Sequence, residues 1–317
     1  MNETKIFERN IDEIETKIMN MSLEEFVSYD PTTDCIDPQT GEKLVSKTDT
    51  TMERFKKFRN NQIDFDADQS LESCIVAMKA YPFIAGDKNT KISVRNGGYN
   101  RCGLKYEITG KEIAFPTMGG SDPKLIEELT YAGDTMNSVM TTINAYYKKF
   151  KCRDFELPQE ALDLIDVYHT MGNFMMIPVW QPSINMARGS GKSRDYFDLY
   201  LLAIYNYYRE MCGELIVGNW TLKNVLGKSD VFHFSDSFLE IFMDWNSFVE
   251  ENHFQDFVEK DENGYGMPKE LWTGHFNCEK YVKPVTKEQF TEFFVNAAER
   301  IKRRSARIYK AMKKGNP

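Results

Sequence analysis

Residues that could carry out chemistry gather in one stretch of the chain, residues 186 to 208, which reads MARGSGKSRDYFDLYLLAIYNYY. Asp195 and Asp198 stand three positions apart at the expected start of a helix, which would place both carboxylates on one helix face. Arg188 precedes them, and a guanidinium binds phosphate or carboxylate through two parallel hydrogen bonds. We therefore expect one of two arrangements. Either the acids and the guanidinium converge on phosphate or a divalent metal ion, or Arg188 ties the loop to one of the two carboxylates.

The Gly191-Lys192-Ser193 tripeptide in this stretch matches only the end of a phosphate-binding Walker loop. Such a loop needs a first glycine five positions before Gly191, between a buried strand and a helix, so that successive backbone N–H groups wrap a phosphate. That position is Met186, and the preceding MMIPVWQPSIN contains two prolines, which exclude a central strand. The sequence therefore predicts a turn into a helix with Ser193 as N-cap, and no Walker-type binding of ATP or GTP.

A second polar group lies upstream, in the segment DVYHTMGNFMMIP. Asp166 and His169 are one turn apart near the end of an expected helix that Gly172 and Asn173 would close. A histidine at that place is stabilised as a cation by the helix dipole, or it serves as a general acid or base. We take His169 as the candidate acid/base.

The segment AGDTMNS forms a third polar group. Asp134 either caps the helix that follows or contributes, with Asn137, to a ligand site. Asn173 and Asn185 would be further hydrogen-bonding anchors of the same site.

The chain that must position these residues is expected to be mainly α, of the α+β class. The capping box formed by Ser22 and Glu25 and the isoleucines before it predict two short helices near the N-terminus. Residues 30–50, rich in Pro, Gly, Thr and Asp, predict an exposed loop. We expect residues 1–60 to comprise these helices and this loop, and residues 61–317 to form a single body.

Within that body we expect a small antiparallel sheet near residues 90–116 and a helical part from 122 to 314. The sheet would contain a hairpin in which residues 104–108 and 111–115 flank a Thr-Gly turn. The expected helices run over residues 122–133, 158–170, 193–212 and 233–252, and from Thr286, with Gln289 as its capping-box partner, to the C-terminal end.

Charge is unevenly distributed in this chain of 317 residues with a formal net charge of −8. Residues 230–262 hold ten acids against one lysine, whereas residues 300–314 hold eight basic residues and no acid. The basic segment predicts an amphipathic helix whose arginines pair with the acidic segment, face nucleic acid, or face a protein or membrane surface. Two sets of residues would occupy opposite faces of this helix: Arg300, Arg303, Arg304 and Arg307, and Ile301, Ile308 and Met312.

The location of the protein is expected from what the chain lacks. No apolar run reaches the roughly 18 to 20 residues of a membrane-spanning helix, and the start MNETKIFERN has no signal-peptide pattern. Six cysteines stand far apart without a C-x-x-C pair, which favours reduced thiols. We expect a cytoplasmic protein with no membrane partner.

Three segments together carry a resemblance: GDTMNS, HTMGNFMMIP and INMARGSGKSRDYFDLYLLAIYNYY. Over roughly residues 104–310 the chain resembles an uncharacterised bacterial domain family with segments of the types GDTMNS, T-I-G-N and N-x-x-R-G followed by D-R-F-D-L-x-L-x-x-I-x-x-Y-Y. The HTMGNFMMIP...SIN part also resembles the G-N-L...N element of GmrSD-type restriction nucleases. Those enzymes need an upstream histidine, and this chain has none before His169, so an HNH nuclease is not assigned.

Two functions remain as hypotheses. The first is a bacterial effector, in phage defence or a toxin system, that hydrolyses phosphodiester bonds of nucleic acid or a nucleotide. His169, Asp195 and Asp198 would be catalytic, Arg188 would hold phosphate, and a divalent metal ion would be the cofactor. The alternative is a non-enzymatic module that binds a nucleotide or a protein. An enzyme would bring His169 and the two acids within about one water molecule of each other in an open pocket, whereas a binding module would bury them in a network.

Overall fold

The structure is a computed structural model, and the fold is described here for the residues that it places. These are residues 11–34, 53, 67–85, 90–94, 102–107, 113–116, 123–126, 128–137, 139–151, 157–178, 196–222, 238–262, 264–278 and 282–315. The α-helices are α2 (Ile11–Asn20), α3 (Leu23–Val27), α5 (Leu71–Ala80), α6 (Pro82–Ala85), α7 (Val139–Phe150), α8 (Gln159–Asp166), α10 (Phe197–Met211), α13 (Trp245–Glu251) and α14 (Lys287–Lys314). The strands are β1 (Lys91–Val94), β2 (Cys102–Glu107), β3 (Ile113–Pro116), β4 (Pro123–Ile126), β5 (Glu128–Thr135), β6 (Phe174–Pro178), β7 (Val258–Asp261) and β8 (Gly264–Pro268). Short 3-10 helices are η1 (Pro31–Asp34), η2 (Ala67–Gln69), η3 (Met171–Asn173) and η4 (His275–Asn277).

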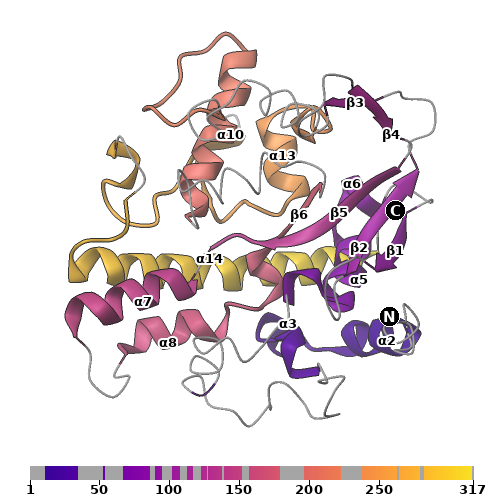
Figure 1. Cartoon of the computed structure of the whole chain (residues 1–317), viewed down its shortest axis with the longest axis horizontal. Coiled ribbons are helices and arrows are strands. Elements are labelled where there is room, and N and C mark those ends of the chain that lie inside the picture. The colour runs from indigo at the N-terminus through magenta and orange to yellow at the C-terminus, as the bar shows by residue number, and fades with distance from the viewer. Residues whose placement is uncertain are drawn as a thin grey trace.

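The fold is mainly α and of the α+β class, as the sequence predicted, and the terminal helix α14 is its axis (Figure 1). At 28 residues, α14 extends about 42 Å. It runs between α7, α8 and α3 on one side and α10 and α13 on the other (Figure 1). Its predicted capping box is confirmed, because Thr286 and Gln289 each accept the backbone N–H of the other. None of the described helices combines the length and the apolar composition of a membrane-spanning segment.

A four-stranded antiparallel sheet covers one end of α14, in the order β1-β2-β5-β6. Its strands come from a wider part of the sequence than residues 90–116, because β5 and β6 complete it. The predicted hairpin between residues 104–108 and 111–115 is wrong. Strand β2 pairs with β1 and β5, while β3 pairs with β4 in a separate two-stranded sheet. Strand β6 lies at the sheet edge, where its terminal Pro178 is tolerated.

The predicted helix over residues 122–133 is also wrong, because this segment forms β4 and most of β5. Gly133 explains part of the difference. A Cβ atom at this position would lie 1.7 Å from the backbone oxygen of Asp68, so only glycine lets β5 approach η2 this closely. Asp134 accordingly lies within the strand, opposite Met175 of β6, and does not cap the next helix. Tertiary packing has overridden a local helix signal.

Other helices are shorter than predicted. Residues 193–195 lie outside the described part of the chain, and α10 begins at Phe197 after Tyr196, which makes no side-chain capping bond. In the segment predicted as a helix over 233–252, a turn separates Phe238 from α13, which begins at Trp245 with Asp244 as its N-cap. Because of that turn, Ile241 is exposed.

The N-terminal helices pack onto the rest of the molecule. The predicted capping box of Ser22 and Glu25 is confirmed. Ile18 and Phe26 are fully buried in the same apolar cluster as α5, the sheet and α10. The predicted exposed loop begins instead as the buried η1, and its residues 35–50 lie outside the described part of the chain. The division of the chain near residue 60 stays a prediction.

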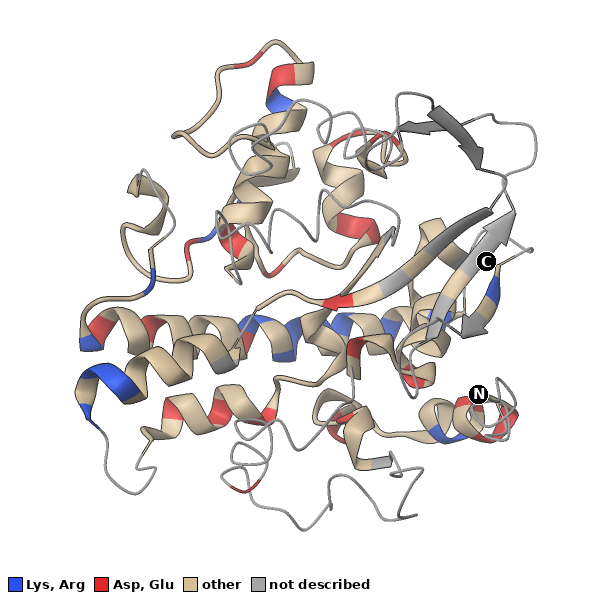
Figure 2. Ribbon diagram, in the orientation of Figure 1, with Lys and Arg blue, Asp and Glu red and all other residues tan. Residues whose placement is uncertain are grey.

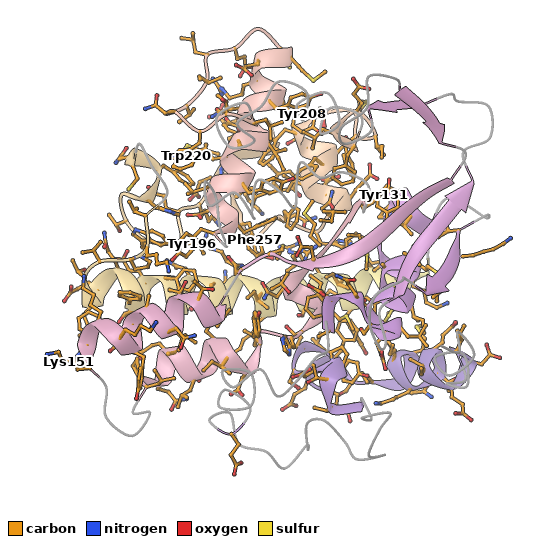
Figure 3. All side chains as sticks on the ribbon, in the orientation of Figure 1. Tyr131, Lys151, Tyr196, Tyr208, Trp220 and Phe257 are labelled. Carbon is orange, nitrogen blue, oxygen red and sulfur yellow. The ribbon has the colours of Figure 1, made fainter. Side chains whose placement is uncertain are left out.

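The described apolar side chains form two clusters, which fill the space on both sides of α14 (Figure 3). The larger one joins the N-terminal helices, the sheet, α10 and α13. The smaller one joins α7, α8 and the first half of α14, and includes Tyr196 and Trp272. The candidate site residues that the structure describes lie in or beside these clusters.

Candidate functional site

Three of the predicted site residues, Asn185, Arg188 and Asp195, lie outside the described part of the chain. The Gly-Lys-Ser tripeptide lies outside it as well. The predicted bond between Arg188 and a carboxylate therefore stays a prediction. The five other candidates are described, and they fall into three groups. The first holds Asp134, Asn137 and Asn173, the second is His169, and the third is Asp198.

Asn137 and Asn173 form a fully buried pair that joins the GDTMNS and TMGN segments. The Asn173 Oδ1 atom accepts the backbone N–H of Asn137 at 3.2 Å and its side-chain amide at 3.4 Å. The Asn173 amide in turn donates to the backbone oxygens of Tyr168, at 2.9 Å, and Asn137. These bonds hold the end of β5 against the turn before β6, so this pair organises the backbone of its own segments.

The backbone of the TMGN segment is packed directly on α14. A Cβ atom on Gly172 would lie 2.0 Å from the backbone oxygen of Ile301 and 2.5 Å from Ser305 Oγ. The N–H group of Gly172 donates to that same hydroxyl at 2.9 Å. Glycine is required here by close approach to a helix, and the expected role in ending α8 does not arise, since α8 already ends at Asp166.

Arg304 enters the centre of this arrangement and is fully buried. Its guanidinium donates to the backbone oxygens of Gly172 at 3.0 Å, Phe174 at 2.7 Å and Asn252 at 3.0 Å, and to the hydroxyl of Tyr81 at 2.9 Å. All four acceptors are uncharged. Burial lowers the pKa of Arg304 and raises that of Tyr81. The buried cation thus links β6, α13 and the end of α5 to α14.

The remaining arginines of α14 also bond within the chain. Arg300 donates to the backbone oxygens of Lys269 and Glu270 at 2.8 and 2.6 Å. Arg307 makes a two-bond pair with Asp256, whose hydrogen bond raises the arginine pKa. Arg303 is exposed and pairs with Glu299 on the same helix. Three of these four arginines therefore face the protein, and the pairing of α14 with the acidic segment is confirmed at Asp256. Figure 2 shows that the Lys and Arg residues of α14 gather mainly in its second half.

His169 is buried in the turn that follows α8, where its ring stacks on Tyr168 with ring centroids 4.4 Å apart. Its Nδ1 atom lies 3.9 Å from Oδ2 of Asp30. The other oxygen of Asp30 accepts the backbone N–H and the hydroxyl of Thr32. The acid beside His169 is therefore Asp30, which the sequence did not indicate.

Asp198, in the first turn of α10, is buried and forms a dyad with His275 of η4. The Asp198 Oδ2 atom lies 2.7 Å from His275 Nδ1 and accepts the backbone N–H of Leu271 at 2.8 Å. Oδ1 accepts the N–H of Leu199 at 3.0 Å. The imidazole stacks on Trp272 with ring centroids 3.5 Å apart, and Tyr196 meets its edge. Sequence reasoning missed His275, although the chain has only four histidines.

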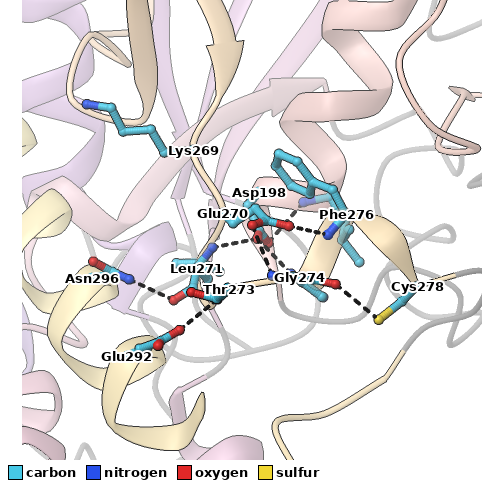
Figure 4. Close-up of polar contacts among 12 residues, drawn as sticks. Asp198, Lys269, Glu270, Leu271, Thr273, Gly274, Phe276, Cys278, Glu292 and Asn296 are labelled. Carbon is cyan, nitrogen blue, oxygen red and sulfur yellow. Dashed lines mark hydrogen bonds and ion pairs between the residues drawn. The ribbon is translucent and has the colours of Figure 1, made fainter. Parts of the chain in front are cut away.

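The segment that carries His275, residues 269–278, is fixed by further hydrogen bonds (Figure 4). Both oxygens of Glu270 accept backbone N–H groups, from Gly274 at 3.1 Å and Phe276 at 2.7 Å. From α14, Glu292 accepts the N–H of Thr273, and Asn296 donates to the backbone oxygen of Leu271. These bonds fix the backbone of residues 269–278 and thereby the position of the His275 side chain.

The chemistry open to the dyad follows from its hydrogen bonds. A carboxylate that accepts from Nδ1–H selects the tautomer whose Nε2 atom carries a lone pair, as in a general base or a metal ligand. His275 Nε2 is buried and has no hydrogen-bond partner in the described structure. No group of three metal-ligating side chains occurs among the described residues, so this dyad by itself does not form a metal centre there. The imidazole is fully buried, so in this conformation the dyad joins α10 to the 269–278 segment.

An open pocket lies at the other end of α10. It has a volume of about 450 Å³, within the usual range of ligand pockets. It lies between the C-terminal end of α10, the start of α13 and the β7–β8 hairpin. The lining residues are Tyr205, Tyr208, Arg209, Met211, Cys212, Glu214, Met243, Asp244, Trp245, Asn246, Asp261 and Tyr265. None of them was a candidate. Tyr205, Tyr208 and Trp245 belong to helical patterns that also predict a core.

The fold and these contacts define a mainly α protein with an antiparallel sheet, a buried polar centre around α14 and an open aromatic pocket. Residues 124–308 match a family of unknown function, DUF6994, and the chain belongs to that family. The expected membership of an uncharacterised domain family is thereby confirmed. Searches of the curated proteins and of the solved structures found no match.

Proposed function

We propose that the chain is a protein-binding module whose contact site is the pocket between α10 and α13, here called the α10–α13 pocket. One observation carries the proposal: two exposed methionines line an aromatic pocket, and an exposed leucine lies in the turn that follows α10. Met211 and Met243 line it and are 64% and 87% exposed, and Leu215, 87% exposed, follows in the turn after α10. Aromatic residues and methionine are enriched at the centres of protein interfaces.

The sequence candidates support a binding module over an enzyme by the criterion of burial. Asn137, Asn173 and Asp198 are almost wholly inaccessible, and each makes hydrogen bonds inside the protein. His169 is paired with Asp30, and Asp198 with His275. The described candidates thus behave as parts of the scaffold that holds α10 and α14 in place, while the accessible pocket lies elsewhere.

Charge favours a protein over a nucleotide as the ligand. The residues that line the pocket include three carboxylates and one guanidinium, a net charge of −2. The phosphates of a nucleotide would be repelled by this charge. The arginines that would have offered a nucleic-acid surface, Arg300, Arg304 and Arg307, donate to acceptors inside the protein.

An unbiased peptide-display selection against the full chain tests this proposal. We expect binders that compete with one another and that fail to bind the variants Met243→Asp and Leu215→Asp. Leu23→Asp is the matched control, since Leu23 is an exposed leucine on α3, on the opposite side of α14 (Figure 1). A selection that yields no binder sensitive to the two pocket variants would contradict the proposal.

A second candidate, phosphodiester hydrolysis in phage defence or a toxin system, rests on the Asp198–His275 dyad. Its supporting observation is the Nε2 atom without a partner, which suits a base that removes a proton from an attacking water molecule. His275 then takes the role that the sequence gave to His169. Incubation with single-stranded and duplex nucleic acids and Mg²⁺ or Mn²⁺ tests it. Cleavage must be lost in His275→Gln and kept in His169→Gln, and equal cleavage by both variants would exclude the dyad.

A further inference from the structure

A row of cations lies on the exposed face of the second half of α14. After Glu299 this helix contains no acidic residue (Figure 2). Its buried face is formed by Ile301, Arg304, Ile308 and Met312. The cations lie on the opposite face, because successive residues of an α-helix are about 100° apart. This face is here called the basic strip, and its exposed cations are Lys302, Arg303, Lys310, Lys313 and Lys314.

Most of the basic strip is not engaged inside the protein. The side chains of Lys302, Lys310 and Lys314 make no ion pair or hydrogen bond within the part of the chain that the structure describes. Arg303 pairs with Glu299, and both side chains are more than half exposed. Lys313 donates to a backbone oxygen of α2, which leaves its charge in place. Five cations, less the charge of Glu299, give the strip a net charge of +4.

Neither the helix dipole nor a neighbouring acid accounts for these cations. The dipole favours cations only within the last turn of a helix, whereas Lys302 and Arg303 lie about three turns before the end of α14. The acidic segment reaches this helix at Asp256, which pairs with Arg307 and not with the strip. Helix α2 meets the strip at Met19, and the acids of its first turn stand about 10 Å further along that helix.

The form of the strip favours a long, regularly charged ligand. From Lys302 to Lys314 it extends about 18 Å, so a small anion would reach only one or two of its cations. Among the described residues of α14, no large apolar side chain beyond Val295 is exposed for insertion into a membrane. The one aromatic residue of this half, Tyr309, packs on Phe26 and is not free to stack on single-stranded bases.

We propose that the basic strip binds the phosphate backbone of a nucleic-acid duplex. A DNA duplex carries about one negative charge per 1.7 Å of its axis, which gives about ten phosphates over the length of the strip. Lysine and arginine contact phosphates, and the strip has no asparagine or glutamine of the kind that reads adenine, so binding should not depend on sequence. This surface is separate from the α10–α13 pocket, and the inference goes beyond the proposed protein-binding function.

Fluorescence anisotropy with labelled DNA and RNA duplexes of about 20 base pairs measures this binding to the full chain. The net charge of −8 opposes attraction at long range, so we expect a Kd of about 1–100 µM at 150 mM NaCl, as in non-specific binding. Three to four phosphate contacts give a log-log salt slope of about −2.7 to −3.6. The affinity should therefore fall about 20- to 50-fold between 50 and 150 mM NaCl.

Two double variants locate the binding surface. Lys302→Gln with Lys310→Gln removes two contacts, which should reduce the slope by about 1.8 and weaken binding at 50 mM NaCl by about tenfold or more. The matched control is Lys148→Gln with Lys149→Gln, two exposed lysines at the end of α7, which packs beside the first half of α14. Each double variant removes two positive charges from the same chain, so a difference between them reports position and not overall charge. Thermal melting verifies that both are folded.

The outcomes separate this proposal from its alternatives. Duplex binding that the strip variant loses and the α7 variant keeps supports it, and a preference for DNA or RNA identifies the source of the duplex. The proposal is overturned if neither duplex binds at 50 mM NaCl, if both double variants weaken binding equally, or if a single strand of the same length binds as tightly. Vesicles of phosphatidylserine and phosphatidylcholine that bind the chain through the strip, when duplexes do not, would assign this surface to a membrane instead.

Discussion

Replacement of Arg304 by methionine is the most direct test of how this fold is held together. The substitution keeps an unbranched side chain of similar length and removes the guanidinium. The backbone oxygens of Gly172 and Asn252 then lose the donor that the structure gives them, whereas that of Phe174 still accepts from the Tyr81 hydroxyl at 3.4 Å. Each buried acceptor left without a donor costs about 1–3 kcal/mol. Burial of a charge is relieved at the same time, which offsets part of this cost.

The two acceptors together cost about 2–6 kcal/mol, and relief of the buried charge offsets part of this. We therefore expect Arg304→Met to lower the free energy of unfolding by about 2–4 kcal/mol, a large part of the roughly 5–15 kcal/mol typical of a folded domain. Removing the buried charge does not offset the whole cost, because the acceptors belong to the backbone and cannot be replaced by apolar groups. The matched control is Arg303→Met, at the preceding residue of α14. The Arg303 side chain is 64% exposed and makes one ion pair, with Glu299 of the same helix. That change should cost less than about 0.5 kcal/mol.

Urea unfolding at pH 7, followed by tryptophan fluorescence and far-ultraviolet circular dichroism, measures both variants. A third variant, Arg304→Lys, keeps the charge but lacks the planar fork, and should fall between the wild type and Arg304→Met. If Arg304→Met proves as stable as Arg303→Met, the guanidinium does not organise the centre of the fold, and the assignment of these four hydrogen bonds is wrong.

Three further substitutions, one of them with a matched control, test other parts of the scaffold. Gly172→Ala should cost more than about 2 kcal/mol, because its Cβ would meet the α14 backbone, whereas Gly266→Ala, with only ordinary contacts, should be nearly neutral in the same urea assay. Burial lowers the pKa of His253 to about 4. The unfolded chain therefore takes up this proton below about pH 6.5 and the native protein only near pH 4, so stability falls by about 3 kcal/mol between those values. His253→Asn should flatten that part of a stability-versus-pH curve, and an unchanged slope would refute the assignment. Asp198→Asn should cost about 1.5–3 kcal/mol by weakening the bond to His275, and an unaltered melting temperature would show that the dyad does not hold η4.

Local signals in the sequence predicted local structure well. The capping boxes at Ser22 and Thr286 satisfy backbone N–H groups within one turn, so four residues suffice to specify them. The amphipathic pattern of the last helix is equally local, and it correctly placed Ile301 and Ile308 in the core. Helix boundaries that no capping box marks were predicted less well. Helices α10 and α13 begin at Phe197 and Trp245, later than the predicted starts at residues 193 and 233.

Contacts between distant parts of the chain could not be predicted in this way. The partner of β5 on one side is β6, about 40 residues further on, and its close approach to Asp68 depends on the absence of a side chain at Gly133. The dyad was missed for the same reason: 77 residues separate Asp198 from His275, and no local pattern joins them. The roles of Gly133 and His275 can be recognised only in the folded structure, where the residues they contact lie close to them.

The acidic segment, residues 230–262, supplies carboxylates to two places in this chain of net charge −8. On the inner side, Asp256 binds Arg307 and thereby helps to hold α14. On the outer side, Asp244 and Asp261 line the α10–α13 pocket, where one cation, Arg209, is already paired with Glu214. Three of the four arginines of α14 thus bond to acceptors elsewhere in the fold, while the described residues that line the α10–α13 pocket carry a net charge of −2.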